Sequence, residues 1–393
     1  MCYNHRTYFN HNYMSDVYQK SLELHLEHQG KLEVASKVSL NDREALSLAY
    51  TPGVAEVCRA IAKDKSQARS LTMKGNMVAV ISDGSAILGL GNLGPEAALP
   101  VMEGKCILFK EFAGLDAFPI CLDTQDEEEI IKAVKLLAPV FGGINLEDIS
   151  APRCFNIEKR LKQELNIPVM HDDQHGTATV VLAGLINALK VKGLDKAETR
   201  VVINGAGAAG TAISKLLLAY GFKNIIICDR QGAIYEGRPG LDSYKQELAA
   251  LSNPEKVSGP LSQALFGADI FIGVSAPGVL NGEMIKAMKP EPIIFALANP
   301  VPEIMPEEAK QAGALIVATG RSDYPNQINN VLVFPGIFRG ALDNMVKMID
   351  AEVLIKAALN LAALVPEPRP DLILPDPFNK EVAPAVARAF SVS

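Results

Sequence analysis

Tryptophan is absent from this chain of 393 residues, aromatic residues make up only 6%, and there are six cysteines. No two cysteines form a C-x-x-C pair, so the usual cysteine signature of a metal or redox centre is missing. Several cysteines stand in apolar stretches such as CILF and IIICD. We therefore expect reduced, buried thiols in a reducing compartment.

Long hydrophobic runs and basic clusters are also absent. The richest apolar stretch, VVLAGLINAL, has ten residues, whereas a membrane span needs roughly 18. The net charge is −7, and nucleic-acid binding requires a concentrated Lys/Arg surface. The polar N-terminus MCYNHRTYFNHNYMSD lacks the apolar core of a secretory signal. We expect a soluble, cytoplasmic protein with no membrane or nucleic-acid partner.

Apolar residues form 48% of the chain, which indicates a globular protein long enough for two or three domains. Predicted strands alternate with predicted helices, which favours parallel, doubly wound sheets in an α/β fold. We expect a flexible tail at 1–14, an N-terminal α/β domain at 15–160 and a Rossmann-type dinucleotide-binding domain at 161–393. The last of these is predicted to end in a C-terminal helical segment.

Individual elements follow from local patterns. Helices are predicted from Asp16, after the turn TPG, over the acidic start of DTQDEEEIIKAVKLLAPVF, and over GTATVVLAGLINALKVKG. Strands are predicted in MVAVIS, KCILFKEF, FPICLD, INLEDI, NIPVMHDD, ADIFIGVSA, PIIFALANP and ALIVATG.

The stretch INGAGAAG carries a G-x-G-x-x-G turn between a β-branched strand and an amphipathic helix. Small residues there let the backbone approach a pyrophosphate at the helix N-terminus. The next strand ends at Asp229, about 20 residues on, where an acid binds the ribose hydroxyls of NAD and repels the 2′-phosphate of NADP. Arg230 follows and keeps NADP as an alternative. The predicted phosphate-binding residues are Gly205, Ala206, Gly207, Ala208, Ala209 and Gly210.

A second G-x-G-x-x-G, in ILGLGNLG, lacks these companions. Leu90, Asn92 and Leu93 are bulky or branched where a phosphate would lie, and no strand ending in an acid follows. The alternatives are a tight turn between strands or the wall of a substrate pocket, and we favour the pocket wall over a second dinucleotide site.

Three acids at apparent strand ends are candidate metal ligands: Glu147, Asp148 and Asp173. Carboxylates suit Mg²⁺ or Mn²⁺, although each acid alone is also compatible with a cap or a surface charge. The spacing of His171 and His175 in HDDQH is that of the zinc histidines in H-E-x-x-H. The general-base Glu is replaced by Asp172, which argues against a zinc hydrolase.

Polar side chains near other strand ends are Ser275, Asn299, Asn329 and Asn330. Asparagine at such positions also makes turns. In the dinucleotide-binding half, however, these residues lie where nicotinamide and substrate would meet.

Several long motifs resemble the malic enzymes, and closest is the short bacterial form: LAYTPGVAEVCRAI, SDGSAILGLGNLGPEAALPVMEGK, LEDISAPRCF, HDDQHGTATV, INGAGAAG, ALANPVPEI and NQINNVLVFPG. The resemblance covers nearly the whole chain from about Asp16 and implies a malic-type N-terminal domain. It further implies oxidative decarboxylation of (S)-malate to pyruvate and CO₂, with NAD or NADP, Mg²⁺ or Mn²⁺, and a homodimer.

The resemblance also implies roles for single residues. Tyr50 would be the general acid, Lys105 the general base and Asp172 an assistant to that base. The three acids would hold the metal. Asn299 and Asn330 would contact malate. From their places near strand ends, we also expect Ser275 and Asn299 at the cofactor and Asn329 at malate.

The chemistry requires Lys105 to be neutral when it accepts a proton. Burial and a nearby cation are expected to lower its pKa from about 10.4. One departure concerns the substrate: larger relatives carry Glu-Arg before ILGLG, where this chain has Ser85 and Ala86.

The alternative functions are a malolactic-type enzyme, a non-decarboxylating 2-hydroxy-acid dehydrogenase and a catalytically silent nucleotide-binding regulator.

Overall fold

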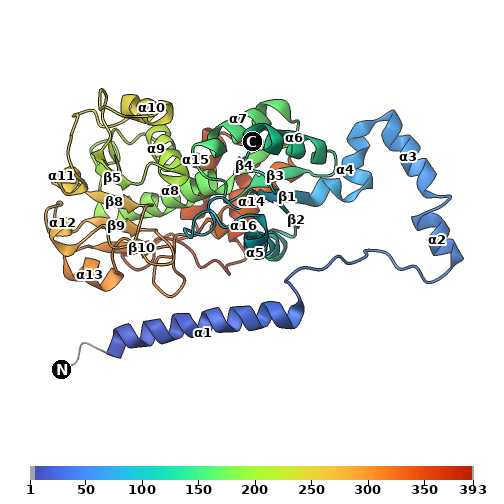
Figure 1. Cartoon of the computed structure of the whole chain (residues 1–393), viewed down its shortest axis with the longest axis horizontal. Coiled ribbons are helices and arrows are strands. Elements are labelled where there is room, and N and C mark those ends of the chain that lie inside the picture. Colours follow the sequence, from blue (N-terminus) through green and yellow to red (C-terminus); the bar gives the residue numbers. More distant parts are fainter. Residues whose placement is uncertain (1–4, 392–393) are drawn as a thin grey trace.

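The computed structural model describes residues 5–391, with side chains from residue 16, and contains two sheets (Figure 1). The first sheet has the order β2-β1-β3-β4, and all its strand pairs are parallel. A helix connects each strand to the next, as parallel pairing requires. In chain order these elements are β1 (Met77–Ser82), α5 (Pro95–Ala113), β2 (Asp116–Cys121), α6 (Glu127–Leu137), β3 (Gly143–Leu146), α7 (Arg153–Glu164) and β4 (Val169–His171).

The second sheet has the order β10-β9-β8-β5-β6-β7, parallel except for the short β7. The long helix α8 (Asp172–Lys192) leads into it. Its elements are β5 (Arg200–Asn204), α9 (Ala208–Tyr220), β6 (Asn224–Asp229), β7 (Gly232–Ala233), α10 (Ser243–Leu251), α11 (Leu261–Leu265), β8 (Ile270–Gly273), α12 (Gly282–Lys286), β9 (Ile293–Ala296), α13 (Pro306–Gln311) and β10 (Ile316–Thr319). The predicted Rossmann-type arrangement is therefore present.

The chain ends with helices that return to the first domain. Phe109 of α5 packs edge-to-face against Phe334 and Phe338, with ring centroids 4.8 and 5.4 Å away. Because these rings are fully buried, they tie α5 to the C-terminal segment through a shared core. That segment comprises η3 (Asn330–Leu332), α14 (Phe334–Asp343), α15 (Ala351–Ala362), α16 (Val382–Ala387) and η4 (Arg388–Phe390).

Most predicted elements are present, but the strand expected at KCILFKEF is wrong. Those residues form the second half of α5, which begins after Gly94 and ends at Gly114 in the left-handed region (φ 63°). The apolar run is the face of a helix buried beside β1, not a buried strand. Apolar runs this short do not distinguish the two by themselves. Of the thiols, Cys106, Cys154 and Cys228 are buried as expected, whereas Cys58 is exposed.

An N-terminal arm extends from this body: α1 (His5–His28), α2 (Arg43–Ala49) and α3 (Val54–Lys63). Figure 1 shows α2 and α3 standing away from both sheets. The arm contacts the body where Lys31 donates to Glu103, and again where Arg69 donates to the carbonyl of Leu342. Between these points no residue of α2 or α3 is buried. The chain returns through η1 (Lys65–Gln67), α4 (Ala68–Leu71) and η2 (Met73–Asn76).

The expected segment limits stay predictions, and the structure shows which elements lie at them. Helix α1 begins at His5, so residues 5–14 are helical, while residues 1–4 of the expected tail lie outside the described residues. The expected boundary at residue 160 falls within α7, and β4 still pairs with β3. Within the described range, no helix is long and apolar enough to cross a membrane.

Candidate active site

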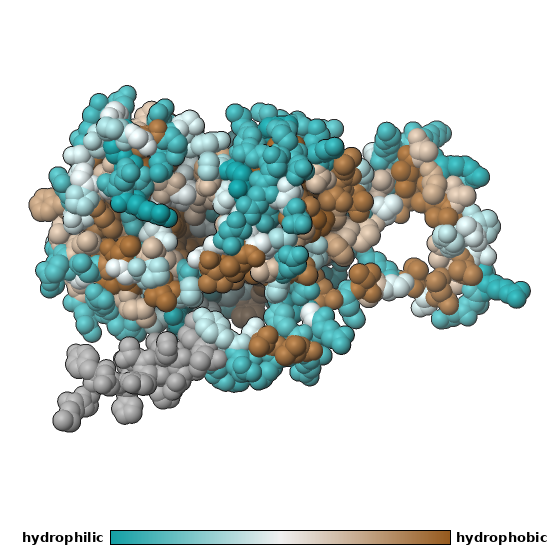
Figure 2. Space-filling view, viewed as in Figure 1, coloured by the Kyte–Doolittle hydropathy of each residue, from teal (hydrophilic) through white to brown (hydrophobic). Residues whose placement is uncertain are grey.

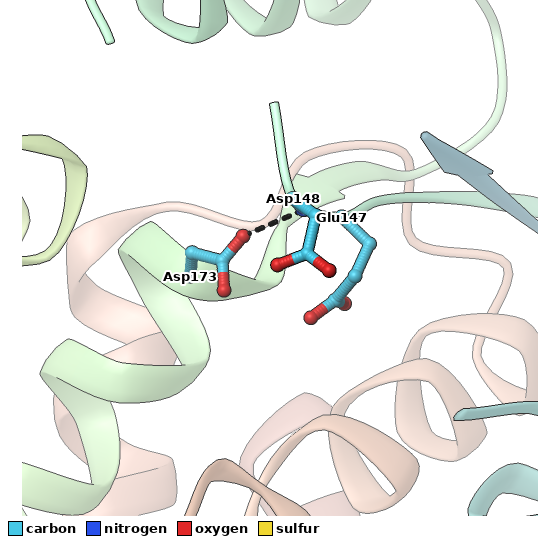
Figure 3. A group of neighbouring side chains, drawn as sticks. All are labelled: Glu147, Asp148 and Asp173. Atoms are coloured by element: carbon cyan, nitrogen blue, oxygen red, sulfur yellow. Dashed lines mark hydrogen bonds between the residues drawn. The ribbon is translucent and has the colours of Figure 1, made fainter. Parts of the chain in front are cut away.

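Three carboxylates meet where the first sheet joins α8. Glu147 and Asp148 follow β3, and Asp173 lies in the first turn of α8 (Figure 3). One oxygen of each acid lies within 4.8 Å of the others. The backbone N–H of Asp148 donates to Asp173 Oδ2 at 2.8 Å. Parallel strands present their carboxyl ends at one edge, and the predicted metal ligands lie together there.

The electrostatics of these acids fit a bound cation. Burial and the neighbouring Asp173 raise the pKa of Asp148 to about 8, and burial raises the pKa of Glu147 well above its ordinary value. Asp148 Oδ2 is buried with no hydrogen-bond partner. An all-oxygen set of carboxylates suits Mg²⁺ or Mn²⁺, and such a cation would relieve the repulsion between the three acids.

Lys105 lies beside these acids. It projects from α5, and only 10% of its side chain is exposed. Its ammonium is 3.1 Å from Glu147 Oε1, forms a short hydrogen bond to Asp172 Oδ2 and donates to Asn330 Oδ1 at 3.3 Å. The ring of Phe334 lies 4.3 Å from the nitrogen. Three segments distant in sequence therefore converge on one amine.

The expected lowering of the Lys105 pKa is not what the described residues produce. Burial does oppose the ammonium, but Asp172 and Glu147 outweigh it and raise the pKa above its ordinary value. The expectation included a nearby cation, whereas the acids alone act here in the opposite sense. The pKa of Lys105 rises because two nearby carboxylates favour the charged form of the amine, as in a salt bridge.

Sequence reasoning missed the buried residues that position this site. Glu158 of α7 is buried and accepts hydrogen bonds from the N–H of His171 and from His175 Nε2 at 2.9 Å. It thereby holds the start of α8, which carries Asp172 and Asp173. Asn145 donates to Glu147 Oε2 at 2.9 Å. The signal available was a polar residue inside an otherwise apolar strand, INL.

The structure does not support the zinc alternative. His175 Nε2 is hydrogen-bonded to the buried Glu158. Among the described residues, the acids that cluster as candidate ligands include neither histidine.

Tyr50 is not part of this arrangement. It follows α2 in the arm, and 65% of it is exposed. Lys105, by contrast, lies in the body of the molecule. The structure therefore does not bring the predicted acid and the predicted base of one chain together.

The predicted phosphate turn joins β5 to α9. A Cβ on Gly210 would lie 1.7 Å from the carbonyl oxygen of Gly205, so only glycine fits. A Cβ on Gly207 would meet nothing within 4 Å, which leaves that backbone open to a ligand. Asp229 ends the neighbouring strand β6. Its side chain is 11% exposed and is engaged by Arg238 and Lys245, which sequence reasoning did not single out.

The other glycine turn lies against the dinucleotide-binding domain. A Cβ on Gly89 would lie 2.7 Å from the carbonyl oxygen of Asn299, which follows β9. Directly before the turn, the N–H of Ala86 donates to the carbonyl oxygen of Asp148 at 3.0 Å. The ILGLGNLG turn thus lies between the acids and Asn299, and its role as a pocket wall stays a prediction.

The remaining polar candidates differ in what their side chains contact. Asn330 contacts Lys105, whereas the side chain of Asn329 accepts from the N–H of Val331 and caps η3. Ser275 Oγ accepts from Asn204, and the N–H of Ser275 donates to the buried Glu303 at 2.9 Å. Glu303 also accepts from the N–H of Ala298, so it joins the loops after β8 and β9.

Comparison with known proteins supplies the family. A model of the malic enzyme N-terminal domain matches residues 29–162, and a model of the malic enzyme NAD-binding domain matches residues 174–391. The chain belongs to the malic enzyme family. Its fold also matches the crystal structure of the NAD-dependent malic enzyme from Thermotoga maritima, with a TM-score of 0.91 and 54% identity. That match covers 94% of this chain and 98% of the solved chain.

Other malic enzymes show how the relatives vary. The bifunctional malic/malolactic enzyme of Bacillus subtilis is 59% identical over 94% of this chain and 91% of its own length. The NAD-dependent malic enzyme of Geobacillus stearothermophilus is also 59% identical, over 92% of this chain and 76% of its length. An NADP-dependent malic enzyme of Rhizobium meliloti is 49% identical, and the match spans 51% of that longer protein. The resemblance to the short bacterial form is confirmed.

Proposed function

We propose that the chain oxidises (S)-malate and removes CO₂ to form pyruvate, with a nicotinamide cofactor and a divalent cation. The observation that carries this proposal is the contact of Lys105 with Asp172 and Glu147, directly beside the three clustered acids. A base that must exchange a proton beside a metal needs such a position.

Lys105 is proposed to accept the proton of the malate hydroxyl while C2 gives its hydride to nicotinamide. An ammonium cannot do this, so Lys105 must first release a proton. Asp172 accepts its hydrogen bond and is the nearest acceptor for that proton. Asn330, which contacts the same amine, would then help to orient both Lys105 and the substrate.

Glu147, Asp148 and Asp173 are proposed to hold Mg²⁺ or Mn²⁺. A cation bound there would supply Lewis-acid stabilisation of the charge that develops as CO₂ leaves. Glu158 and Asn145 keep these acids in place through the hydrogen bonds described above.

Tyr50 is proposed to protonate C3 after CO₂ leaves, but in the active site of a second copy of the chain. Residues 40–66 make hydrogen bonds only within their own segment and the adjoining turn, as far as the described residues go. The arm carries exposed apolar side chains, including Leu48 (71% exposed). Figure 2 shows this hydrophobic surface along the arm. A homodimer would cover that surface and bring Tyr50 to the partner's Lys105 site.

NAD is proposed as the preferred cofactor, with NADP as the alternative. Support comes from the NAD-dependent relatives of Geobacillus stearothermophilus and Thermotoga maritima and from the acid at position 229. An NADP-dependent relative at 49% identity keeps the alternative open.

A malolactic reaction is a second candidate, because the Bacillus subtilis relative bears that name together with the malic one. In that reaction the reduced cofactor would stay bound and reduce pyruvate to lactate. The same site residues would serve both outcomes, and the products distinguish them.

The test is a single assay. Purified protein is mixed with malate, Mn²⁺ and either NAD or NADP, and reduced cofactor, pyruvate, oxaloacetate and lactate are measured together. Equal amounts of reduced cofactor and pyruvate, both lost with EDTA, are expected. Reduced cofactor with oxaloacetate and no pyruvate would contradict the proposal, and lactate without free reduced cofactor would favour the malolactic reaction.

A further inference from the structure

Glu303 is an acid in a place where a charge is costly. It is fully buried in the segment between β9 and α13. Among the described residues no cation pairs with its carboxylate, and burial raises the pKa of Glu303 above its ordinary value. A buried carboxylate without a cation destabilises the folded state unless hydrogen bonds compensate for the lost water. The hydrogen-bond partners of Glu303 therefore indicate its role.

These partners are backbone amides of two different loops. Glu303 Oε1 accepts from the N–H of Ser275 at 2.9 Å, and Oε2 accepts from the N–H of Ala298 at 3.0 Å. The carbonyl of Glu303 also accepts from the N–H of Leu280 at 3.1 Å. A Cβ on Gly273 would lie 2.4 Å from the carboxyl carbon of Glu303, so the end of β8 is packed against this side chain. One residue thus joins the loop after β8 to the loop after β9.

Both loops lie at the carboxyl edge of the second sheet. From β5 the chain continues to β6 on one side, and it later crosses to β8 on the other side of β5. Sheets of this kind bind a dinucleotide in the crevice at the point where the strand order reverses. The phosphate turn follows β5, and the acid at the end of β6 is on the side of the adenosine ribose. The loops after β8 and β9 are therefore on the side of the nicotinamide.

Asn299 directly follows the amide of Ala298 that Glu303 holds. Asn299 is exposed, but two glycines lie close to it. A Cβ on Gly320 would lie 2.8 Å from Asn299 Nδ2, and a Cβ on Gly89 would lie 2.7 Å from the carbonyl oxygen of Asn299. With backbone this close on two sides, the position of Asn299 depends on where its loop is held.

A second buried acid of the same sheet is built differently. Asp269 precedes β8 and is also buried, but Lys289 Nζ lies 2.8 Å from its carboxylate. The N–H of Arg200 donates to the same carboxylate at 2.9 Å. Asp269 therefore has a cation, and it lies at the amino end of its strand, away from the edge where ligands bind. It serves as a matched control for the burial of an acid in this domain.

We propose that Glu303 is a positioning residue for the nicotinamide half of the cofactor, because its carboxylate fixes the loops that carry Ser275 and Asn299. Both carboxylate oxygens are engaged by backbone, so Glu303 acts through these loops and not by contact with the reacting atoms. The inference rests on the proposed function for its meaning in catalysis. Its effect on binding can be measured without turnover.

The test compares the binding of NAD with that of ADP-ribose, which lacks the nicotinamide, by calorimetry. Glu303→Gln keeps the size of the side chain but replaces one acceptor oxygen by an amide nitrogen, so one loop loses its hydrogen bond. This variant is expected to bind NAD about tenfold more weakly and to bind ADP-ribose as the wild type does. Glu303→Ala should show a larger loss of the same kind. Asp269→Asn should lower Tm and leave both affinities unchanged.

In turnover assays, Glu303→Gln is expected to lower kcat for malate oxidation about tenfold, because a displaced nicotinamide receives the hydride less readily. Asp269→Asn should keep the wild-type kcat, and an equal fall in kcat in the two variants would contradict a positioning role.

Two binding results would overturn the proposal. One is an equal loss of affinity for NAD and ADP-ribose in the Glu303 variants, and the other is an unchanged affinity for NAD in both of them. A loss confined to NAD, in a wild-type protein that shows no malate turnover, would refute the proposed function and leave the role of Glu303 standing.

Discussion

The Lys105 site and the arm that carries Tyr50 are built in opposite ways. Lys105 is buried and contacts three other polar residues, whereas Tyr50 is 65% exposed and directly follows α2, a helix with no buried residue. The contacts around Lys105 hold its side chain in place within its own chain. Tyr50 lies exposed on an apolar arm, and another surface would have to hold it in place. The comparison supports the proposal that one chain supplies Lys105 and the three acids of the site, while Tyr50 comes from a second copy.

Removing the base should have the largest effect. Lys105→Ala is expected to lower malate oxidation by about 10⁴-fold, because Lys105 is the proposed acceptor of the hydroxyl proton. Binding of NAD, measured by calorimetry, should be unchanged. Lys110→Ala, on the same helix but exposed and paired with Asp116, is the matched control and should keep full activity. Normal turnover in Lys105→Ala would remove it from the mechanism.

Removing the proposed acid should cost less, because solvent can supply a proton slowly. Tyr50→Phe is expected to lower pyruvate formation about 10²- to 10³-fold. Oxaloacetate reduction, which needs no proton at C3, should fall much less. Tyr18→Phe, an exposed tyrosine of α1, serves as control. Equal losses in both reactions would contradict a role limited to protonation.

Weakening the proposed arm contact should give a smaller effect that depends on concentration. Leu48→Asp is expected to shift the protein from dimer to monomer and to lower specific activity about tenfold in dilute solution, with recovery at high protein concentration. Leu136→Asp is matched closely, since Leu136 is 72% exposed on α6 of the body and Leu48 is 71% exposed. Sedimentation would detect the difference, and identical behaviour of the two variants would argue against the arm as an interface.

The smallest expected effect is that of the cation on thermal stability, and it depends on the three clustered acids of a single chain. Mn²⁺ is expected to raise Tm by a few degrees, because it binds the folded state only. Asp148→Asn should abolish the increase, and Tyr50→Phe should retain it. An increase that persists in Asp148→Asn would place the cation elsewhere.

The sequence predicts best where one local pattern determines the structure. The phosphate turn, the strand ends that bear Glu147 and Asp148, and the helix that ends at Gly193 are all local features, and they are present. The strand predicted at KCILFKEF is wrong, because a stretch of eight residues does not distinguish the periodicity of a strand from that of a helix.

Features that depend on contacts between distant segments could not be predicted. The neighbours that raise the Lys105 pKa come from residues 147 and 172, and the cations that occupy Asp229 follow it by nine and sixteen residues. The exposure of Tyr50 likewise has no local signature, because AYTPG is the same motif whether or not a surface lies opposite it.

Complementation between two inactive variants tests the shared active site most directly. Tyr50→Phe and Lys105→Ala chains, each with a different tag, are coexpressed, and the mixed dimer is purified and assayed with malate, Mn²⁺ and NAD. A shared site would leave one intact Tyr50–Lys105 pair in each mixed dimer, so about half of wild-type activity should return. A mixed dimer as inactive as its parents would show that Tyr50 and Lys105 act within one chain.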